Sequence, residues 1–294
     1  MGHQQAEAVS HGAITIINAM ATGKGAAVGI KLWTKARVTL TDQPGVFIAR
    51  NLSDKAESTR LVEVTAEHVL KRFGCGQRFG AIVETESNIP IAVGLKSSSA
   101  VSNAVALACV KALGKKTSDI QTIKLGVEGS LRARVTLTGA YDDACACYFG
   151  GVVVTDNAHR KILKQFNPKG KLHVLIHVPT QKKYTHDIDP APLNNIKSTI
   201  QLAHKEALRG NYWNALTLNG LAYSTALGYD MVAPIEALSA GALAAGLSGK
   251  GPATAAVVPA SKRENVRSAW RHLSGVILET TFNFRKASAR RVTA

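Results

Sequence analysis

Hydrophobic and polar positions along this chain follow periods that match both helices and strands. Apolar residues recurring at intervals of three and four indicate one buried helix face, a spacing found at Val101, Ala104, Val105, Ala108 and Ala112. Gly114 then stands where a helix commonly ends. A second helix is expected at residues 118–136. Runs of apolar and β-branched residues predict strands at residues 12–18, 25–40, 79–87 and 150–156.

A polar break at residues 166–170, Phe-Asn-Pro-Lys-Gly, divides this pattern into two halves. Beyond the break we expect strands at residues 172–178, 253–258 and 275–282, and helices at residues 192–209, 212–227, 234–244 and 261–273. A chain of 294 residues can bury a full core and suits two domains. The pattern therefore predicts an α+β protein with domains at residues 1–165 and 166–294.

The loop before the first predicted helix combines a glycine with three serines. Gly94 permits backbone angles that a side chain forbids, and the hydroxyl groups of Ser97, Ser98 and Ser99 can cap the helix. The first helical turn leaves N–H groups unpaired at the positive end of the helix dipole. The loop therefore predicts a phosphate site, although taken alone it also fits a simple capped turn.

Two Gly-Lys pairs, at Lys24 and Lys250, invite comparison with a P-loop. That motif places a Ser or Thr directly after the lysine, whereas Gly25 and Gly251 follow here. A nucleotide site in this chain must use another kind of loop.

Three segments in a fixed order resemble the motifs of the GHMP kinases. Their second motif, Pro-x-x-x-Gly-Leu-x-Ser-Ser-Ala, is matched from Pro90 onward except for its final alanine, which is Ser99 here. Residues 142–151 resemble the segment that carries the family's catalytic aspartate, and residues 247–252 resemble its glycine-rich third motif.

Within that family the chain is most similar to the archaeal shikimate kinases, over roughly residues 12–259. The shared features are the segment at residues 18–27, the second motif at residues 94–100 and the Thr-Gly-Ala-aromatic-Asp-Asp-Ala pattern at residues 138–144. The resemblance implies a two-domain GHMP kinase fold, with an N-terminal α+β domain, a ferredoxin-like C-terminal domain and the active site between them. It also implies ATP-dependent, Mg²⁺-assisted phosphorylation of the 3-hydroxyl of shikimate, with another small alcohol such as homoserine as the alternative.

The resemblance extends to individual binding residues. Ser98 matches the serine that binds magnesium in the family, and Glu128 lies near the place of its acidic partner. Magnesium retains water and phosphate ligands, so two protein groups are sufficient. The segments expected to bind ATP contain Pro90, Gly94, Leu95, Lys96, Ser97, Ser98, Ser99, Ala100, Ser248, Gly249 and Gly251.

Asp142 matches the catalytic aspartate of the family, and Asp143 is the alternative. An aspartate in a run of alanine and cysteine residues is costly unless it is paired or functional. We therefore expect Asp142 to orient or deprotonate the attacking hydroxyl. Lys24 and Lys96 could each stabilise the transferring phosphoryl group, and we favour Lys24 because glycines flank it on both sides.

The carboxylate of shikimate also requires a cation, and arginine suits it because a guanidinium binds a carboxylate through two parallel hydrogen bonds. The sequence leaves four candidates open: Arg60, Arg72, Arg132 and Arg134.

Charge introduces a second hypothesis, because 36 Lys and Arg against 20 Asp and Glu give a formal net charge of +16. A positive field attracts anionic substrates and polyanions alike, so a nucleic-acid-binding protein on the same scaffold is the alternative. Dispersed basic residues and only 5% aromatic residues disfavour nucleic acid as a partner. The basic tail is expected to be a frayed end; its cations are Arg285, Lys286, Arg290 and Arg291.

The four cysteines lack C-x-x-C spacing and are expected to be reduced core residues, with no structural metal. No apolar stretch is long enough to span a bilayer, and the N-terminus lacks the features of a secretory signal. We expect a cytoplasmic protein without a membrane partner, and the sequence leaves its oligomeric state open.

Overall fold

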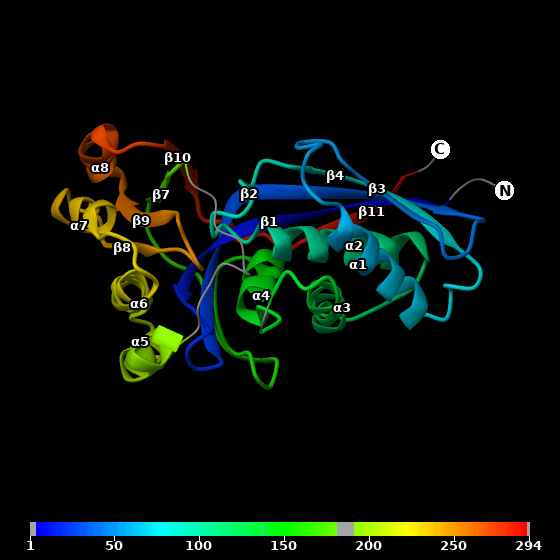
Figure 1. The fold of residues 1–294 in the computed structure, drawn as a ribbon, viewed down its shortest axis with the longest axis horizontal. Coiled ribbons are helices and arrows are strands. Elements are labelled where there is room, and N and C mark those ends of the chain that lie inside the picture. The colour runs from blue at the N-terminus through cyan, green and yellow to red at the C-terminus, as the bar shows by residue number, and fades with distance from the viewer. Residues whose placement is uncertain (1–3, 137, 181–190, 293–294) are drawn as a thin grey trace.

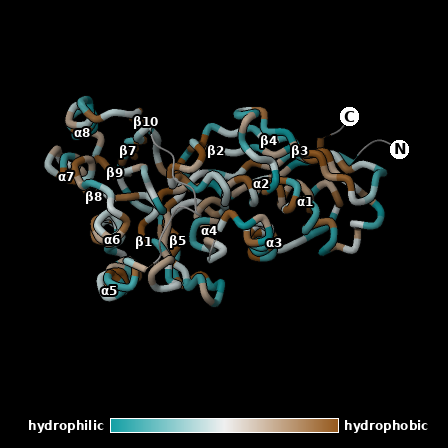
Figure 2. Tube along the Cα trace, viewed as in Figure 1, coloured by the Kyte–Doolittle hydropathy of each residue, from teal (hydrophilic) through white to brown (hydrophobic). Residues whose placement is uncertain are grey.

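The computed structural model describes residues 4–136, 138–180 and 191–292, which form two β-sheets with helices packed against them (Figure 1). The larger sheet lies on the right of Figure 1, and both chain ends lie at its far end, away from the smaller sheet. Hydrophobic residues are concentrated along the strands, and hydrophilic residues in the connecting loops (Figure 2). The active-site segments predicted from the sequence meet where the two parts of the molecule adjoin.

The larger sheet has seven strands within the described residues. In spatial order its main path is β11 (Ser288–Val292), β1 (Gln5–Ile17), β2 (Lys24–Thr41), β4 (Gly80–Ser87) and β3 (Phe47–Asn51). β5 (Val152–Asp156) pairs with β2 and with β6 (Lys161–Phe166). β3 and β4 are parallel, and the other neighbouring strands are antiparallel.

The smaller sheet is antiparallel, with the spatial order β10 (Val276–Thr281), β7 (Leu172–Val178), β9 (Thr254–Pro259) and β8 (Ala244–Leu247). Numbered along the chain, its strands are ordered four, one, three, two. With helices between the first and second strands and between the third and fourth, this is the ferredoxin-like arrangement that the resemblance implied.

Eight α-helices complete the described fold. Four of them lie along one face of the larger sheet (Figure 1): α1 (Arg60–Arg72), α2 (Ser97–Ala112), α3 (Asp119–Arg132) and α4 (Tyr141–Phe149). The other four belong with the smaller sheet: α5 (Lys197–Leu208), α6 (Tyr212–Leu227), α7 (Val232–Ser239) and α8 (Arg263–Ala269). No helix in the described ranges is both long and apolar enough to cross a bilayer.

One hydrophobic core joins the two sheets. It includes Ile14 of β1, Cys145 of α4, Val174 of β7, Leu216 of α6 and Ala255 of β9, all of them at most 1% exposed. Burial of apolar surface is the main favourable contribution to folding, so this shared core fixes the sheets relative to one another. Any residue that lies between them is held by both.

The predicted polar break coincides with the change of sheet, since β6 ends at Phe166 in the larger sheet and β7 begins at Leu172 in the smaller one. The α+β class is confirmed. The helix expected at residues 234–244 is partly wrong, because α7 ends at Ser239 and Gly241 takes a φ of 101° before β8 begins. Strands β3, β6 and β8 and helices α1 and α4 were not anticipated.

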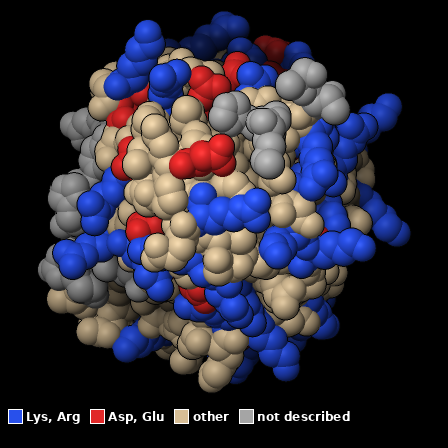
Figure 3. All heavy atoms as spheres, turned by 90° about the vertical axis from the view of Figure 1, so that its right-hand side faces the viewer, with Lys and Arg blue, Asp and Glu red and all other residues tan. Residues whose placement is uncertain are grey.

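The prediction of a frayed basic tail is wrong. Residues 288–292 form β11, which pairs antiparallel with β1. Arg290 and Arg37 each bind the buried carboxylate of Glu7, at 2.8 and 2.5 Å, and hydrogen bonds from these two guanidinium groups hold the pKa of Glu7 below its usual value. Lys286 binds Asp119 at 2.9 Å. The tail therefore forms part of the basic end of the molecule, where Lys and Arg outnumber Asp and Glu (Figure 3).

A chain ending at Ala287 tests the role of β11. We expect its thermal unfolding midpoint to fall by at least about 2 °C, the shift that about 1 kcal/mol produces in a protein of this size, because β1 loses its edge partner and Glu7 loses Arg290. The matched control lacks only residues 293–294. Equal midpoints for the two chains, measured by circular dichroism, would show that β11 adds nothing to stability.

Candidate functional site

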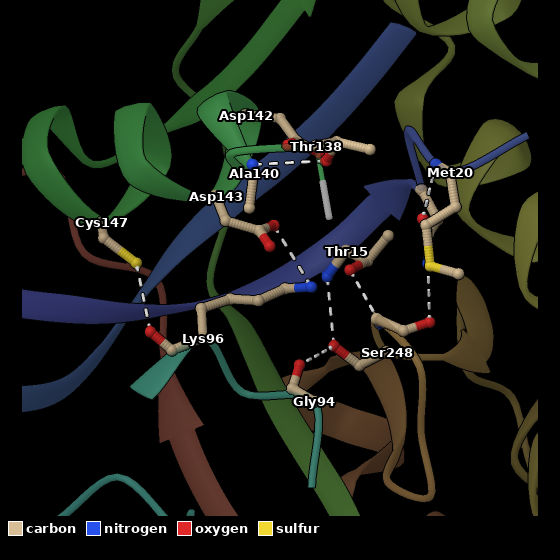
Figure 4. A network of polar contacts seen from close by, with 12 residues as sticks. Thr15, Met20, Gly94, Lys96, Thr138, Ala140, Asp142, Asp143, Cys147 and Ser248 are labelled. Atoms are coloured by element: carbon tan, nitrogen blue, oxygen red, sulfur yellow. Dashed lines mark hydrogen bonds and ion pairs between the residues drawn. The ribbon is translucent and has the colours of Figure 1, made fainter. Parts of the chain in front are cut away.

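A cavity of about 520 Å³ lies between the loop before α2, the loop before α4, the end of β1 and the β8–β9 loop. Eight of the residues predicted to be catalytic or to bind ATP or magnesium line it: Gly94, Lys96, Ser97, Ser98, Ser99, Asp142, Asp143 and Gly249. The segments that contain them are far apart in the sequence and meet in Figure 4. The structure thus brings the three motifs together around one space.

Gly94 is placed by a contact with the β8–β9 loop. Its φ is 92°, and a Cβ at this position would overlap the carbonyl oxygen of Ser248. The Ser248 hydroxyl donates to the Gly94 carbonyl at 2.8 Å and accepts from the amide of Thr15 at 3.2 Å (Figure 4). The glycine is therefore required by its backbone angle, as the sequence indicated, and also by a close approach between two protein loops.

Helix α2 begins without a side-chain cap. Its N-cap is Lys96, in the left-handed conformation with a φ of 66°, so the expected capping by serine hydroxyls is wrong. In the described part of the chain, nothing accepts a hydrogen bond from the amides of Ser97, Ser98 and Ser99. Free amides at the positive end of a 16-residue helix form a site for an anion.

Lys96 points into the cavity from the same turn. Its ammonium group lies 3.2 Å from Oδ1 of Asp143, and the two side chains are 7% and 16% exposed (Figure 4). The pair is therefore largely buried, and salt screens a buried pair less than an exposed one. A cation in this position faces any phosphate that binds at the α2 amides.

Asp142 lies one residue before Asp143 but in a different environment. It is 3% exposed, and its Oδ1 accepts a hydrogen bond of 2.7 Å from Nδ2 of Asn157. A Cβ on Gly25 would overlap its other carboxylate oxygen. Burial, and secondly the charge of Asp143, raise the pKa of Asp142 to about 7. A carboxyl group with this pKa can exchange a proton near neutral pH.

Lys24 does not line the cavity. Its neighbour Gly25 faces Asp142, and successive residues of a strand point to opposite faces of the sheet. Lys24 is exposed and lies opposite Asp156 on β5. The sequence argument from its flanking glycines missed this alternation.

Glu128 also lies outside the cavity. Its carboxylate binds His68 at 2.8 Å and Arg160 at 3.2 Å. Ser130, two residues further along α3, does line the cavity, and residues two apart on a helix do not share a face. Among the described residues, no cluster of three or more His, Cys, Asp or Glu side chains is placed to hold a metal.

The remaining predicted residues support the loops without lining the cavity: Pro90, Leu95, Ala100, Ser248 and Gly251. Leu95, Ala100 and Ser248 are at most 1% exposed. Of the four arginine candidates for the substrate carboxylate, Arg60 and Arg134 line the cavity, and Arg72 and Arg132 do not. The sequence missed Asn157, which lies beyond the last residue of the aspartate motif.

Comparison with known proteins agrees with this geometry. Residues 60–151 match the GHMP kinases N terminal domain. The shikimate kinase of Methanosarcina mazei is 41% identical over 95% of this chain and 94% of its own length, and that of Pyrococcus furiosus is 42% identical over 92% and 96%. The chain belongs to the archaeal shikimate kinases of the GHMP kinase family.

Solved structures of this superfamily share the fold. A homoserine kinase from Cytophaga hutchinsonii has a TM-score of 0.75 at 18% identity, covering 98% of both chains. The mevalonate kinase of L. major, solved with R-mevalonate, has a TM-score of 0.71 at 14% identity, covering 96% of both chains. At these identities the likeness establishes the GHMP kinase fold alone.

Replacing Gly94 by alanine should weaken ATP binding by more than backbone strain alone explains. We expect the Michaelis constant for ATP to rise at least about tenfold, because the new Cβ drives the α2 loop from Ser248 and strains a positive φ. Gly45→Ala is the matched control, since Gly45 has a φ of 77° with nothing within 4 Å of the added Cβ. Equal ATP constants in the two variants would contradict the role of the loop contact.

Proposed function

We propose that this protein transfers the γ-phosphoryl group of ATP to the 3-hydroxyl of shikimate. The observation that supports it best is the meeting, in one cavity, of the free α2 amides, the Lys96–Asp143 pair and a buried Asp142. The first binds phosphate, the second supplies a cation and the third supplies a base. Full-length similarity to curated shikimate kinases selects the substrate within the GHMP kinases.

The nucleotide phosphates are assigned to the first turn of α2. Ser98 lines the cavity there and its hydroxyl makes no hydrogen bond with the described residues, so it fits the single protein ligand that a nucleotide-bound Mg²⁺ needs. Glu128 is turned to His68 and Arg160 and is not assigned to the metal. When bound, Mg²⁺ neutralises charge on the phosphate oxygens.

Asp142 is assigned to accept the proton of the attacking hydroxyl. Its pKa of about 7 leaves a substantial ionised fraction at neutral pH, and general bases work best when their pKa is near the working pH. Lys96 is assigned to the charge of the transferring phosphoryl group. Phosphoryl transfer depends mainly on positioning and electrostatic stabilisation, which a buried, ion-paired ammonium group supplies without reorganisation.

The substrate assignment is tested by ADP release, measured with a coupled assay on shikimate, homoserine and mevalonate. We expect turnover with shikimate and at least about a hundredfold lower kcat/KM with the others. Turnover with homoserine or mevalonate and none with shikimate would keep the kinase chemistry and overturn the substrate. Absence of ADP release with all three would overturn the proposed activity.

Asp142→Asn separates the roles of the two adjacent acids. We expect its turnover number to fall by about two orders of magnitude or more, with little change in ATP affinity, as the loss of a general base usually does. Because the base acts when ionised, kcat/KM of the native enzyme should rise with pH through about 7, and this rise should vanish in the variant.

Asp143→Asn is the companion variant. Normal turnover in Asp142→Asn with loss in Asp143→Asn would transfer the base to Asp143. Normal turnover in both would remove this segment from the chemistry. Circular dichroism confirms that each variant is folded.

Lys96→Met and Lys24→Met test which lysine acts on the phosphoryl group. Removal of one preorganised charge-stabilising donor commonly costs about 10²- to 10³-fold in turnover, and we expect such a loss for Lys96→Met alone. Lys24→Met, which removes an exposed cation of the same kind, should stay within about twofold of the native rate. The reverse result in steady-state kinetics would restore the sequence-based choice of Lys24.

A further inference from the structure

Asn157 is a buried polar residue that no sequence motif includes. It follows the last residue of β5, is 4% exposed, and its backbone amide donates to the carbonyl of Gly23 at 2.8 Å. Its side chain lies against Asp142, fifteen positions earlier in the sequence. A buried side-chain amide destabilises the fold unless its hydrogen bonds are satisfied. Two of the hydrogen bonds of Asn157 are made with Asp142, the proposed base.

The hydrogen bonds around Asn157 fix which way its amide points. Oδ1 accepts from the backbone amide of Asp142 at 3.2 Å and from the hydroxyl of Thr155 at 2.6 Å. The reversed amide would set Nδ2 against the Asp142 N–H and Oδ1 against the carboxylate, which are two repulsive contacts. Nδ2 therefore donates to Oδ1 of Asp142, at 2.7 Å.

The opposite side of the carboxylate is closed by backbone. Oδ2 of Asp142 lies so close to Gly25 that a Cβ there would overlap it. The hydroxyl of Thr155, which is fully buried, also lies 3.2 Å from the Gly25 carbonyl. Two strands of the larger sheet thus hold Asp142 from two directions, and only one of these contacts carries a donor for its charge.

We propose that Asn157, oriented by Thr155, is the positioning residue that holds the Asp142 carboxylate in place and ionised for proton transfer. The proposal rests on the proposed function of Asp142 as the base. The Asn157 amide favours the ionised carboxylate because it donates a hydrogen bond to Oδ1. The other carboxylate oxygen, Oδ2, is held against the backbone of Gly25. The role is distinct from contact with substrate, since Asn157 does not line the cavity.

Other charged or titratable groups face Asp142 and set the background for any pH measurement. They are Asp143, Cys145 and Cys147 on α4, Lys96 before α2 and Tyr223 on α6. Burial and the charge of Asp143 raise the pKa of Asp142, whereas the hydrogen bond from Asn157, the charge of Lys96 and a hydrogen bond from the backbone N–H of Asp143 lower it. Removal of Asn157 must therefore raise this pKa further and move the acid limb of activity to higher pH.

The test compares Asn157→Ala with the pair Thr155→Val and Thr155→Ser. In Asn157→Ala we expect kcat/KM for shikimate at pH 7 to fall at least about tenfold and to recover partly by pH 9. Thr155→Val should shift the acid limb in the same direction by a smaller amount, and Thr155→Ser, which keeps the hydroxyl, should restore the native profile. If Asn157→Ala does not fold, the Thr155 pair alone decides.

A second readout does not depend on activity. In protein labelled with ¹³C at aspartate carboxyl carbons, the Asp142 resonance is the one absent from Asp142→Asn, and its titration gives the pKa directly. A higher Asp142 pKa in Asn157→Ala and Thr155→Val supports the proposal. An unchanged pKa and an unchanged acid limb in folded variants overturn it. A shifted pKa in a protein whose Asp142→Asn variant keeps full turnover overturns the proposed base instead.

Discussion

The contact between Gly94 and Ser248 is the constraint on which the rest of the site depends. No side chain fits between them, so the loop before α2 and the β8–β9 loop are in direct backbone contact. The first loop belongs to the part of the molecule with the larger sheet, and the second connects two strands of the smaller sheet. Ser248 also accepts from Thr15, and the amide of Gly249 donates to the Thr15 hydroxyl at 2.8 Å. This closure sets where α2 begins, and therefore where its free amides and Lys96 face the cavity.

Helix α4 gives two adjacent carboxylates two different environments. Neighbouring residues on a helix point about 100° apart, so Asp143 faces Lys96 across the cavity while Asp142 faces the end of β5 and the backbone of Gly25. One acid is paired with a cation, and the other is buried and accepts hydrogen bonds only from neutral groups, the Asn157 amide and the backbone N–H of Asp143. Enzymes commonly separate the roles of paired carboxylates by such differences in environment, and here the separation follows from helix geometry.

The loop before α2 could be predicted from local backbone chemistry, because its glycine and serines are adjacent in the sequence. The aspartates were singled out by resemblance to the GHMP kinase motifs, and the α+β class followed from the hydrophobic pattern. The errors arise where distant contacts decide. Arg290 was predicted to lie in a frayed tail, but it lies in β11 and binds Glu7 of β1, which is far away in the sequence. Lys24 and Glu128 carry suitable charges, but the alternation of β2 and the turn of α3 direct them elsewhere. Asn157 carries no motif, and only its position beside Asp142 reveals it.

The burial that suits Asp142 to its proposed role as the base also works against the stability of the fold. Its pKa is raised to about 7 in the folded protein from the ordinary value of 3.8, so the folded state holds a proton that the unfolded chain releases between these pH values. Stability from this group is therefore greatest at low pH and declines as pH rises toward 7, which is the range in which the carboxylate becomes useful as a base. The Asn157 amide reduces this penalty without removing it, since a stronger counter-charge such as a second lysine would lower the pKa and weaken the base. A neutral donor, placed by Thr155 and the backbone of Asp142, satisfies both requirements.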